Sequence, residues 1–211
     1  MREGYLVEQF EDLAKQKDAA RLGMWAFLGS EALLFTGLFA LYAAYRALYP
    51  SEFSAAVAHN DARLGTLNTF ILLTSSFTVA LSVHEVRLER PRRVALLLLG
   101  SVLLGFVFLG VKFTEYSAHF RLGIYPGAAY HFTELTGYGP QVFFTLYYFS
   151  TGLHALHVTA GMGVLAWLAL STARGKYTAL YHTPLELGAL YWHLVDIIWI
   201  FLWPCLYLMH D

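Results

Sequence analysis

Five long apolar runs limit this chain to a small set of folds. They cover residues 22–48, 66–86, 94–116, 140–172 and 185–209 of the 211-residue chain. Each run is long enough to cross the roughly 30 Å hydrocarbon core of a bilayer as a helix. Inside a bilayer the backbone must satisfy its own hydrogen bonds, and separate runs of this length do so as α-helices. The sequence therefore predicts an all-α integral membrane bundle of five transmembrane helices.

The composition agrees with a membrane protein and excludes several classes of function. The chain is 57% hydrophobic and 14% charged, whereas soluble domains carry about 25% charged residues. Its net charge of −1 gives no reason to expect nucleic acid as a partner. The single cysteine, Cys205, excludes an internal disulfide and a metal site with two thiolates from this chain.

The chain divides into a tail of residues 1–21 and a five-helix transmembrane domain of residues 22–211. The tail mixes acids and bases and lacks the apolar core of a signal peptide. Leu6, Phe10 and Leu13 stand at helical spacing, so the tail forms either a short helix at the membrane surface or an irregular segment. Residues 117–139 form the one long connection, which we expect to pack on a partner or lie at the membrane surface.

The distribution of Lys and Arg predicts the orientation. Ten of the 14 basic residues fall in three segments that alternate spans place on one side: Arg2, Lys15, Lys17, Arg21, Arg87, Arg90, Arg92, Arg93, Arg174 and Lys176. The other side holds Arg46, Arg63, Lys112 and Arg121. The positive-inside rule then puts the N-terminus in the cytoplasm and the C-terminus outside.

Glu31 is the most unusual residue of the first predicted helix. At 1.5 Å per residue it lies about 14 Å in from residue 22, near mid-membrane. A lone carboxylate at this depth takes up a proton or finds a partner. Two interpretations remain open: a carboxyl group hydrogen-bonded within the bundle, or one that is linked to proton movement or contacts a partner.

The last predicted helix carries three ionisable residues within an apolar and aromatic run. Glu186 and His193 are one heptad apart and Asp196 lies three residues further on, so all three share one side of the helix. Ionisable groups inside a membrane are costly and are candidates for function. By depth, a cluster of Glu31 with His193 and Asp196 is geometrically possible.

The fourth predicted helix holds His154 and His157, three residues apart on one face. Two histidines can face one metal or haem, and His193 is the other histidine within a span. A non-haem metal site needs three or four protein ligands, so a hydrogen-bonded packing seam is the favoured interpretation. Gly152, Gly161 and Gly163 in the same run indicate close approach of a neighbouring helix.

Two further groups of polar residues favour structural roles. Small hydroxyl residues in the second run, among them Thr69, Ser75 and Ser76, are typical of helix seams. Lys112 and Glu115 are three apart and either pair with each other or let the lysine reach the interface. The sequence has no phosphate-binding glycine loop, Gly-x-Ser-x-Gly, His-Glu-x-x-His or paired-cysteine motif. It therefore shows no catalytic set.

The chain resembles subunit III of the haem–copper respiratory oxidases. Four stretches carry the resemblance in the family's order: Trp25, Ser30, Glu31, Leu34, Phe35, Leu38, Phe39 and Tyr42; Leu67, Asn68, Thr69, Leu73, Ser75 and Ser76; Phe143, Phe144 and Gly152 to Val158 with Gly161; and Tyr191, Trp192, His193, Val195, Asp196 and Trp199. A weaker match covers Lys112, Phe113, Glu115 and Tyr116. The chain is similar to the short five-helix bacterial form, which lacks two N-terminal helices of the longer form.

The resemblance implies an accessory role in a bacterial cytoplasmic membrane. Subunit III carries no cofactor, since haem and copper belong to subunits I and II. It packs on subunit I, binds phospholipid, supports proton uptake and protects the catalytic centre during turnover. Without the two extra helices, this chain is not expected to form the family's complete lipid cleft, and a small neighbouring subunit has room to replace them. Glu31, His154, His157, Glu186, His193 and Asp196 are then proton-linked or structural polar residues.

The sequence thus predicts a non-catalytic subunit of a proton-pumping oxidase that reduces O₂ to water. Cytochrome c is the favoured electron donor. A quinol oxidase subunit or a homologue associated with nitric oxide reductase is the alternative. A self-standing membrane redox protein, with His154, His157 and His193 holding haem or metal, is the alternative of another class.

Overall fold

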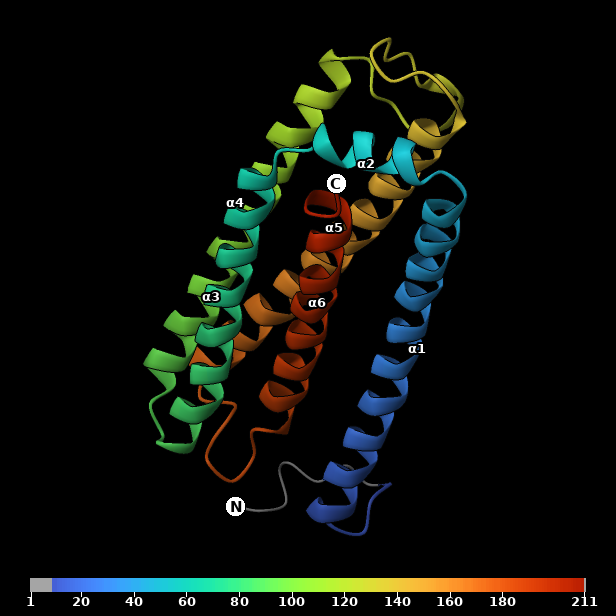
Figure 1. Ribbon diagram of the computed structural model, residues 1–211. Coiled ribbons are helices and arrows are strands. Elements are labelled where there is room, and N and C mark those ends of the chain that lie inside the picture. Colours follow the sequence, from blue (N-terminus) through green and yellow to red (C-terminus); the bar gives the residue numbers. More distant parts are fainter. Residues whose placement is uncertain (1–8, 211) are drawn as a thin grey trace.

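Residues 9–210 of the protein are described by a computed structural model, and they form six α-helices and one short 3-10 helix (Figure 1). The elements in chain order are α1 (Leu13–Leu48), α2 (Pro50–Ala58), α3 (Ala62–Arg87), α4 (Pro91–Arg121), η2 (Gly127–Ala129), α5 (Tyr138–Ala173) and α6 (Thr183–Tyr207). No strand occurs within the described residues. All the α-helices except α2 are long and apolar enough to cross a membrane, which confirms the predicted all-α bundle with five spans.

Local sequence signals set the ends of the helices. The Asp12 carboxylate accepts a hydrogen bond from the Lys15 N–H at the start of α1, and Asp61 caps α3 in the same way, which satisfies N–H groups that have no partner inside the helix. Proline lies in the first turn of α2, α4 and α6, where its missing N–H is harmless. Three residues join α3 to α4, and Glu89 among them has φ +55°, a left-handed conformation that makes the turn tight.

The helices α3 to α6 form the body of the bundle, and α1 leans against one side of it (Figure 1). α3 and α4 pack along each other, α4 also packs on α5, and α6 contacts both α3 and α5. α1 packs on α5 and α6. Short α2 crosses one end of the bundle, while the start of α1, the α3–α4 turn and the α5–α6 connection lie together at the other end (Figure 1). The predicted basic segments within the described residues therefore share one end.

Large aromatic side chains fill the core and need glycines opposite them. Trp192 and Trp199 of α6 are fully buried. A Cβ atom on Gly161 of α5 would lie 2.8 Å from the Trp192 ring, so only glycine lets α5 and α6 approach this closely. Gly152 and Gly163 were expected to have the same role, but a Cβ on either meets nothing within 4 Å.

Several boundaries differ from those predicted from hydropathy. α1 begins at Leu13, inside the predicted tail, and α2 was not expected. α4 continues to Arg121, so the connection to α5 is shorter than predicted. That connection packs on its own chain: the Tyr148 hydroxyl donates to the Ile124 carbonyl at 2.8 Å, and Ile124 is fully buried. Leu6 lies outside the described residues, and the division into a tail and a membrane domain stays a prediction.

Candidate polar sites in the membrane bundle

Glu31 of α1 pairs with His157 of α5. His157 Nε2 lies 2.8 Å from Glu31 Oε2, and Nδ1 lies 2.8 Å from the Leu153 carbonyl oxygen. A carbonyl only accepts, so Nδ1 carries a proton. The Glu31–His157 bond is then made either by a protonated carboxyl group and a neutral imidazole or by a carboxylate and an imidazolium. Both arrangements are neutral as a pair, which suits a site inside a membrane.

His154 has a different environment, although it lies one turn before His157. Its side chain is fully buried, with the ring 5.5 Å from Phe108 and 5.1 Å from Trp199 between centroids. Neither ring nitrogen has a hydrogen-bond partner among the described residues. The two histidines therefore do not act as a common ligand pair in this arrangement.

His193 and Asp196 of α6 both lie near Ser76 of α3. His193 Nδ1 is 2.6 Å from the Ser76 hydroxyl oxygen. Asp196 is 3% exposed, and neither of its carboxyl oxygens has a partner within hydrogen-bond geometry in the described part of the chain. Ser76 is a polar neighbour of the Asp196 carboxyl group, although no hydrogen bond joins the two side chains. The cluster with Glu31 that depth allowed does not form, because Glu31 contacts His157 instead.

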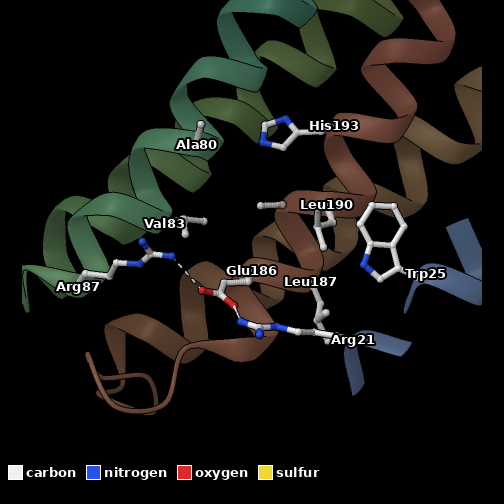
Figure 2. Close-up of a pocket in the computed structure, with 10 residues that line it drawn as sticks. Arg21, Trp25, Ala80, Val83, Arg87, Glu186, Leu187, Leu190 and His193 are labelled. Carbon is white, nitrogen blue, oxygen red and sulfur yellow. Dashed lines mark hydrogen bonds and ion pairs between the residues drawn. The ribbon is translucent and has the colours of Figure 1, made fainter. Parts of the chain in front are cut away.

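Glu186 joins three elements at the basic end of the bundle. Its two carboxylate oxygens lie 3.0 Å from the guanidinium groups of Arg21 on α1 and Arg87 on α3, and His182 Nε2 lies 3.2 Å away. Figure 2 shows Glu186 between the two arginines, with His193 further along α6. Glu186 is thus separated from the other two ionisable residues of α6, although all three face the same side of that helix.

A groove opens between α1, α3 and α6 beside Glu186. Its volume is about 480 Å³. Arg21, Arg87 and Glu186 stand at one end, His193 stands at the other, and Trp25, Val83 and Leu190 are among the apolar residues between them (Figure 2). The groove connects the charged end of the bundle with the half-buried His193 of α6.

A buried ion pair on α4 is a major polar feature that the sequence interpretation undervalued. Lys112 Nζ donates to Glu115 Oε2 at 2.8 Å, to the Tyr147 hydroxyl at 2.9 Å and to the Tyr207 hydroxyl at 2.8 Å. Tyr207 in turn donates to Glu115 Oε1 at 2.8 Å. Lys112 is 4% exposed and Glu115 2%, so the lysine does not extend to the interface. The two tyrosines, from α5 and α6, gave no signal in sequence spacing.

Hydroxyl residues of α3 bond across helix seams, as expected for small hydroxyl residues in a membrane span. The Trp192 and Trp199 indole N–H groups donate to Ser75 and Thr69, each at 3.1 Å. The Ser101 hydroxyl of α4 lies 2.7 Å from that of Thr78. These bonds confirm the packing interpretation of the α3 hydroxyls, because they link α3 to both of its neighbours.

The polar geometry can be compared with known proteins. The family described as cytochrome c oxidase subunit III matches residues 6–210. The chain belongs to this family. The match includes all five spans and every polar site described above.

Relatives of two functional kinds resemble this subunit III chain to the same degree. The quinol oxidase subunit 3 of Bacillus subtilis is 30% identical over 193 residues, which are 89% of this chain and 86% of the relative. The cytochrome c oxidase subunit 3 of Thermostichus vulcanus is 32% identical over 191 residues, with the same coverage. The cytochrome c oxidase subunit 3 of Lycodon semicarinatus is 30% identical over 195 residues, but the matched region is only 68% of that longer protein.

The described residues of this subunit III chain do not assemble a metal-ligand set. No group of three or more His, Cys, Asp or Glu side chains in residues 9–210 is arranged to hold a metal ion. His157 uses both ring nitrogens in hydrogen bonds, and His193 bonds Ser76. The arrangement therefore favours hydrogen-bonded partners for these histidines over the redox site considered from the sequence.

Proposed function

We propose that this chain is the accessory subunit III of a haem–copper terminal oxidase that reduces O₂ to water and pumps protons across a bacterial cytoplasmic membrane. The observation that carries the proposal is the family match over residues 6–210. The polar sites support it, since Glu31, Lys112 and Glu186 have partners within the chain. Haem and copper are held by subunits I and II, and this subunit stabilises subunit I, binds phospholipid and supports proton uptake.

The start of α1 faces the cytoplasm in this proposal. The α3–α4 turn and the α5–α6 connection lie at the same end (Figure 1), and these segments carry most of the basic residues. The positive-inside rule places such an end in the cytoplasm. The far end, with α2 and η2, then lies outside, where it is available to a neighbouring subunit.

The Glu31–His157 pair holds α1 against the bundle at mid-membrane. α1 packs on α5 and α6 rather than on α3 and α4, and its exposed side carries Leu22, Leu33 and Leu41. Because α1 makes less contact with the bundle than the other long helices do, its position depends more strongly on each hydrogen bond that it makes to the bundle. We infer that the pair positions α1 for contact with lipid or subunit I and has no step in O₂ reduction.

Co-purification tests the proposal directly. The tagged chain, extracted in a mild detergent from its own membranes, is expected to carry along the two catalytic subunits, identified by mass spectrometry, together with haem absorbance. When subunit III is dissociated from the complex, the haem should stay with subunits I and II. Recovery without any haem–copper subunit, or with stoichiometric haem on the dissociated chain, would contradict the proposal.

The electron donor is cytochrome c in our proposal, with quinol as the second candidate because the relatives include both kinds. The purified complex separates the two. Rapid oxidation of reduced cytochrome c without added quinol supports the first, whereas oxidation of quinol alone supports the second.

A further inference from the structure

We propose that the groove between α1, α3 and α6 is a water-filled inlet that brings proton exchange to His193 and, through Ser76, to the buried carboxyl group of Asp196. The inlet opens beside Arg21, Arg87 and Glu186 and closes at His193 (Figure 2). This inference concerns a site within the chain and goes beyond its accessory function.

The first step is the unusual state of Asp196. The side chain is 3% exposed, and both oxygens lack hydrogen-bond partners among the described residues. Neither oxygen forms an ion pair or hydrogen bond with a described residue, and Ser76 is a polar neighbour. A carboxylate with no counter-charge in an apolar interior is strongly disfavoured. Asp196 is therefore a carboxyl group that carries a proton.

The second step is the connection from Asp196 to the groove. The Ser76 hydroxyl lies 2.6 Å from His193 Nδ1. His193 lines the groove, and its Nε2 makes no hydrogen bond within the described residues. His193 Nε2 is thus free to bond water in the groove. Ser76 lies between the His193 imidazole and the Asp196 carboxyl group.

The third step is the size and setting of the groove. A volume of about 480 Å³ holds several waters, each of which takes about 30 Å³ in the liquid. Among the charged or titratable groups on the elements around it, Arg21, Arg87 and Glu186 stand at its mouth. Glu31 of α1 pairs with His157 of α5. The polar groups at both ends give water hydrogen-bond partners. The apolar stretch between them that water has to span is about 10 Å long, the rise of α6 from Glu186 to His193.

The exchange is balanced at every atom. In the outward direction the carboxyl proton moves to Ser76 Oγ, the Ser76 hydroxyl proton moves to His193 Nδ1, and Nε2 gives its proton to groove water. The first transfer requires the Ser76 side chain to turn toward the carboxyl group, because neither Asp196 oxygen has a hydrogen bond in the described arrangement. The same transfers in reverse restore the starting state, and repeated cycles replace the Asp196 proton by one from water.

Infrared spectroscopy in D₂O tests the inlet on membranes that contain the full chain in its complex. The C=O stretching band of protonated Asp196 is identified as the band lost in Asp196→Asn. We expect it to shift soon after transfer to D₂O in the unmodified protein. His193→Phe should slow this shift by about a hundredfold, the lower range for a positioned proton-transfer group, and His84→Phe, an exposed histidine of α3, should leave it unchanged.

Three outcomes would overturn the inlet. They are no band lost in Asp196→Asn, a band that fails to shift in the unmodified protein because an acyl chain fills the groove, or equal shift rates with and without His193. If His193→Phe fails to assemble, Ser76→Ala is used in its place. Loss of the hydroxyl should change the frequency of the Asp196 C=O band and also slow its shift in D₂O. The measurement follows this chain's own carboxyl group, so its result is distinguishable from failure of the proposed oxidase function.

Discussion

At the scale of single residues, the imidazole of His157 makes hydrogen bonds through both of its nitrogens. Glu31 is the partner of one of them. A proton is shared between the two side chains, and the pair is neutral whichever of them holds it. The Glu31 side chain is 18% exposed and that of His157 11%, so neither has ready access to water as a substitute partner. Loss of the carboxyl group therefore leaves a half-satisfied imidazole in the α1–α5 seam.

Substitution of Glu31 separates hydrogen bonding from charge. Glu31→Gln keeps a hydrogen-bond partner for His157 Nε2, whereas Glu31→Ala removes it at a cost of about 1–3 kcal/mol. We expect Glu31→Ala to leave the initial rate of O₂ consumption largely intact but to shorten sustained turnover or reduce assembly, and Glu31→Gln to behave like the unmodified protein. Oxygen-electrode traces and subunit ratios measure both. Equal loss in the two variants would show that charge, not the bond, is required.

The Lys112–Glu115 pair makes a second residue-scale prediction. The three donors of the ammonium group each have an acceptor, so the pair is fully satisfied. Lys112→Met leaves the Glu115 charge buried, which costs about 3–5 kcal/mol when a buried pair is broken. Thermal unfolding in detergent should show a lower midpoint for Lys112→Met than for the double variant Lys112→Met/Glu115→Met. Equal midpoints would contradict the role of the uncompensated charge.

At the scale of elements, hydropathy predicted the spans well, whereas side-chain partners were predicted poorly. Apolar length decides where a helix crosses a membrane, and that property is local in the sequence. The partners of Lys112, namely Tyr147 and Tyr207, lie 35 and 95 residues away, and only the fold brings them together. Helix α2 escaped prediction because nine residues are too few to give a hydropathy signal.

The seam between α5 and α6 gives a prediction with a matched control. Gly161→Val forces a side chain into the Trp192 and Tyr191 rings, and overpacking of this kind costs about 1–3 kcal/mol. Gly152→Val introduces the same group on the same helix, where a Cβ meets nothing within 4 Å. We expect only Gly161→Val to lower the unfolding temperature of the complex. A similar loss in both variants would indicate helix propensity rather than packing as the cause.

At the scale of the whole molecule, the orientation is the property that remains to be measured. In a Cys205→Ala background, an Arg92→Cys substitution places a thiol in the first turn of α4, next to the α3–α4 turn, and Ala128→Cys places one in η2 at the opposite end. If the basic end is cytoplasmic, a membrane-impermeant maleimide should label only the Ala128→Cys variant in intact cells and both variants after lysis. The reverse pattern would invert the proposed topology.

The length of α1 gives its anchoring a mechanical consequence. Its 36 residues make a rod of about 54 Å, tied at one end where the Tyr42 hydroxyl meets the Cys205 carbonyl and at the other where Arg21 meets Glu186. Arg21 lies about 31 Å from Tyr42 along the rod. A tilt of about 10° at the Tyr42 end would thus move Arg21 by about 5 Å, and it would also strain the Glu31–His157 bond that lies between them. A neighbouring subunit that changes the tilt of α1 at one face of the membrane would therefore change the width of the groove at the opposite face.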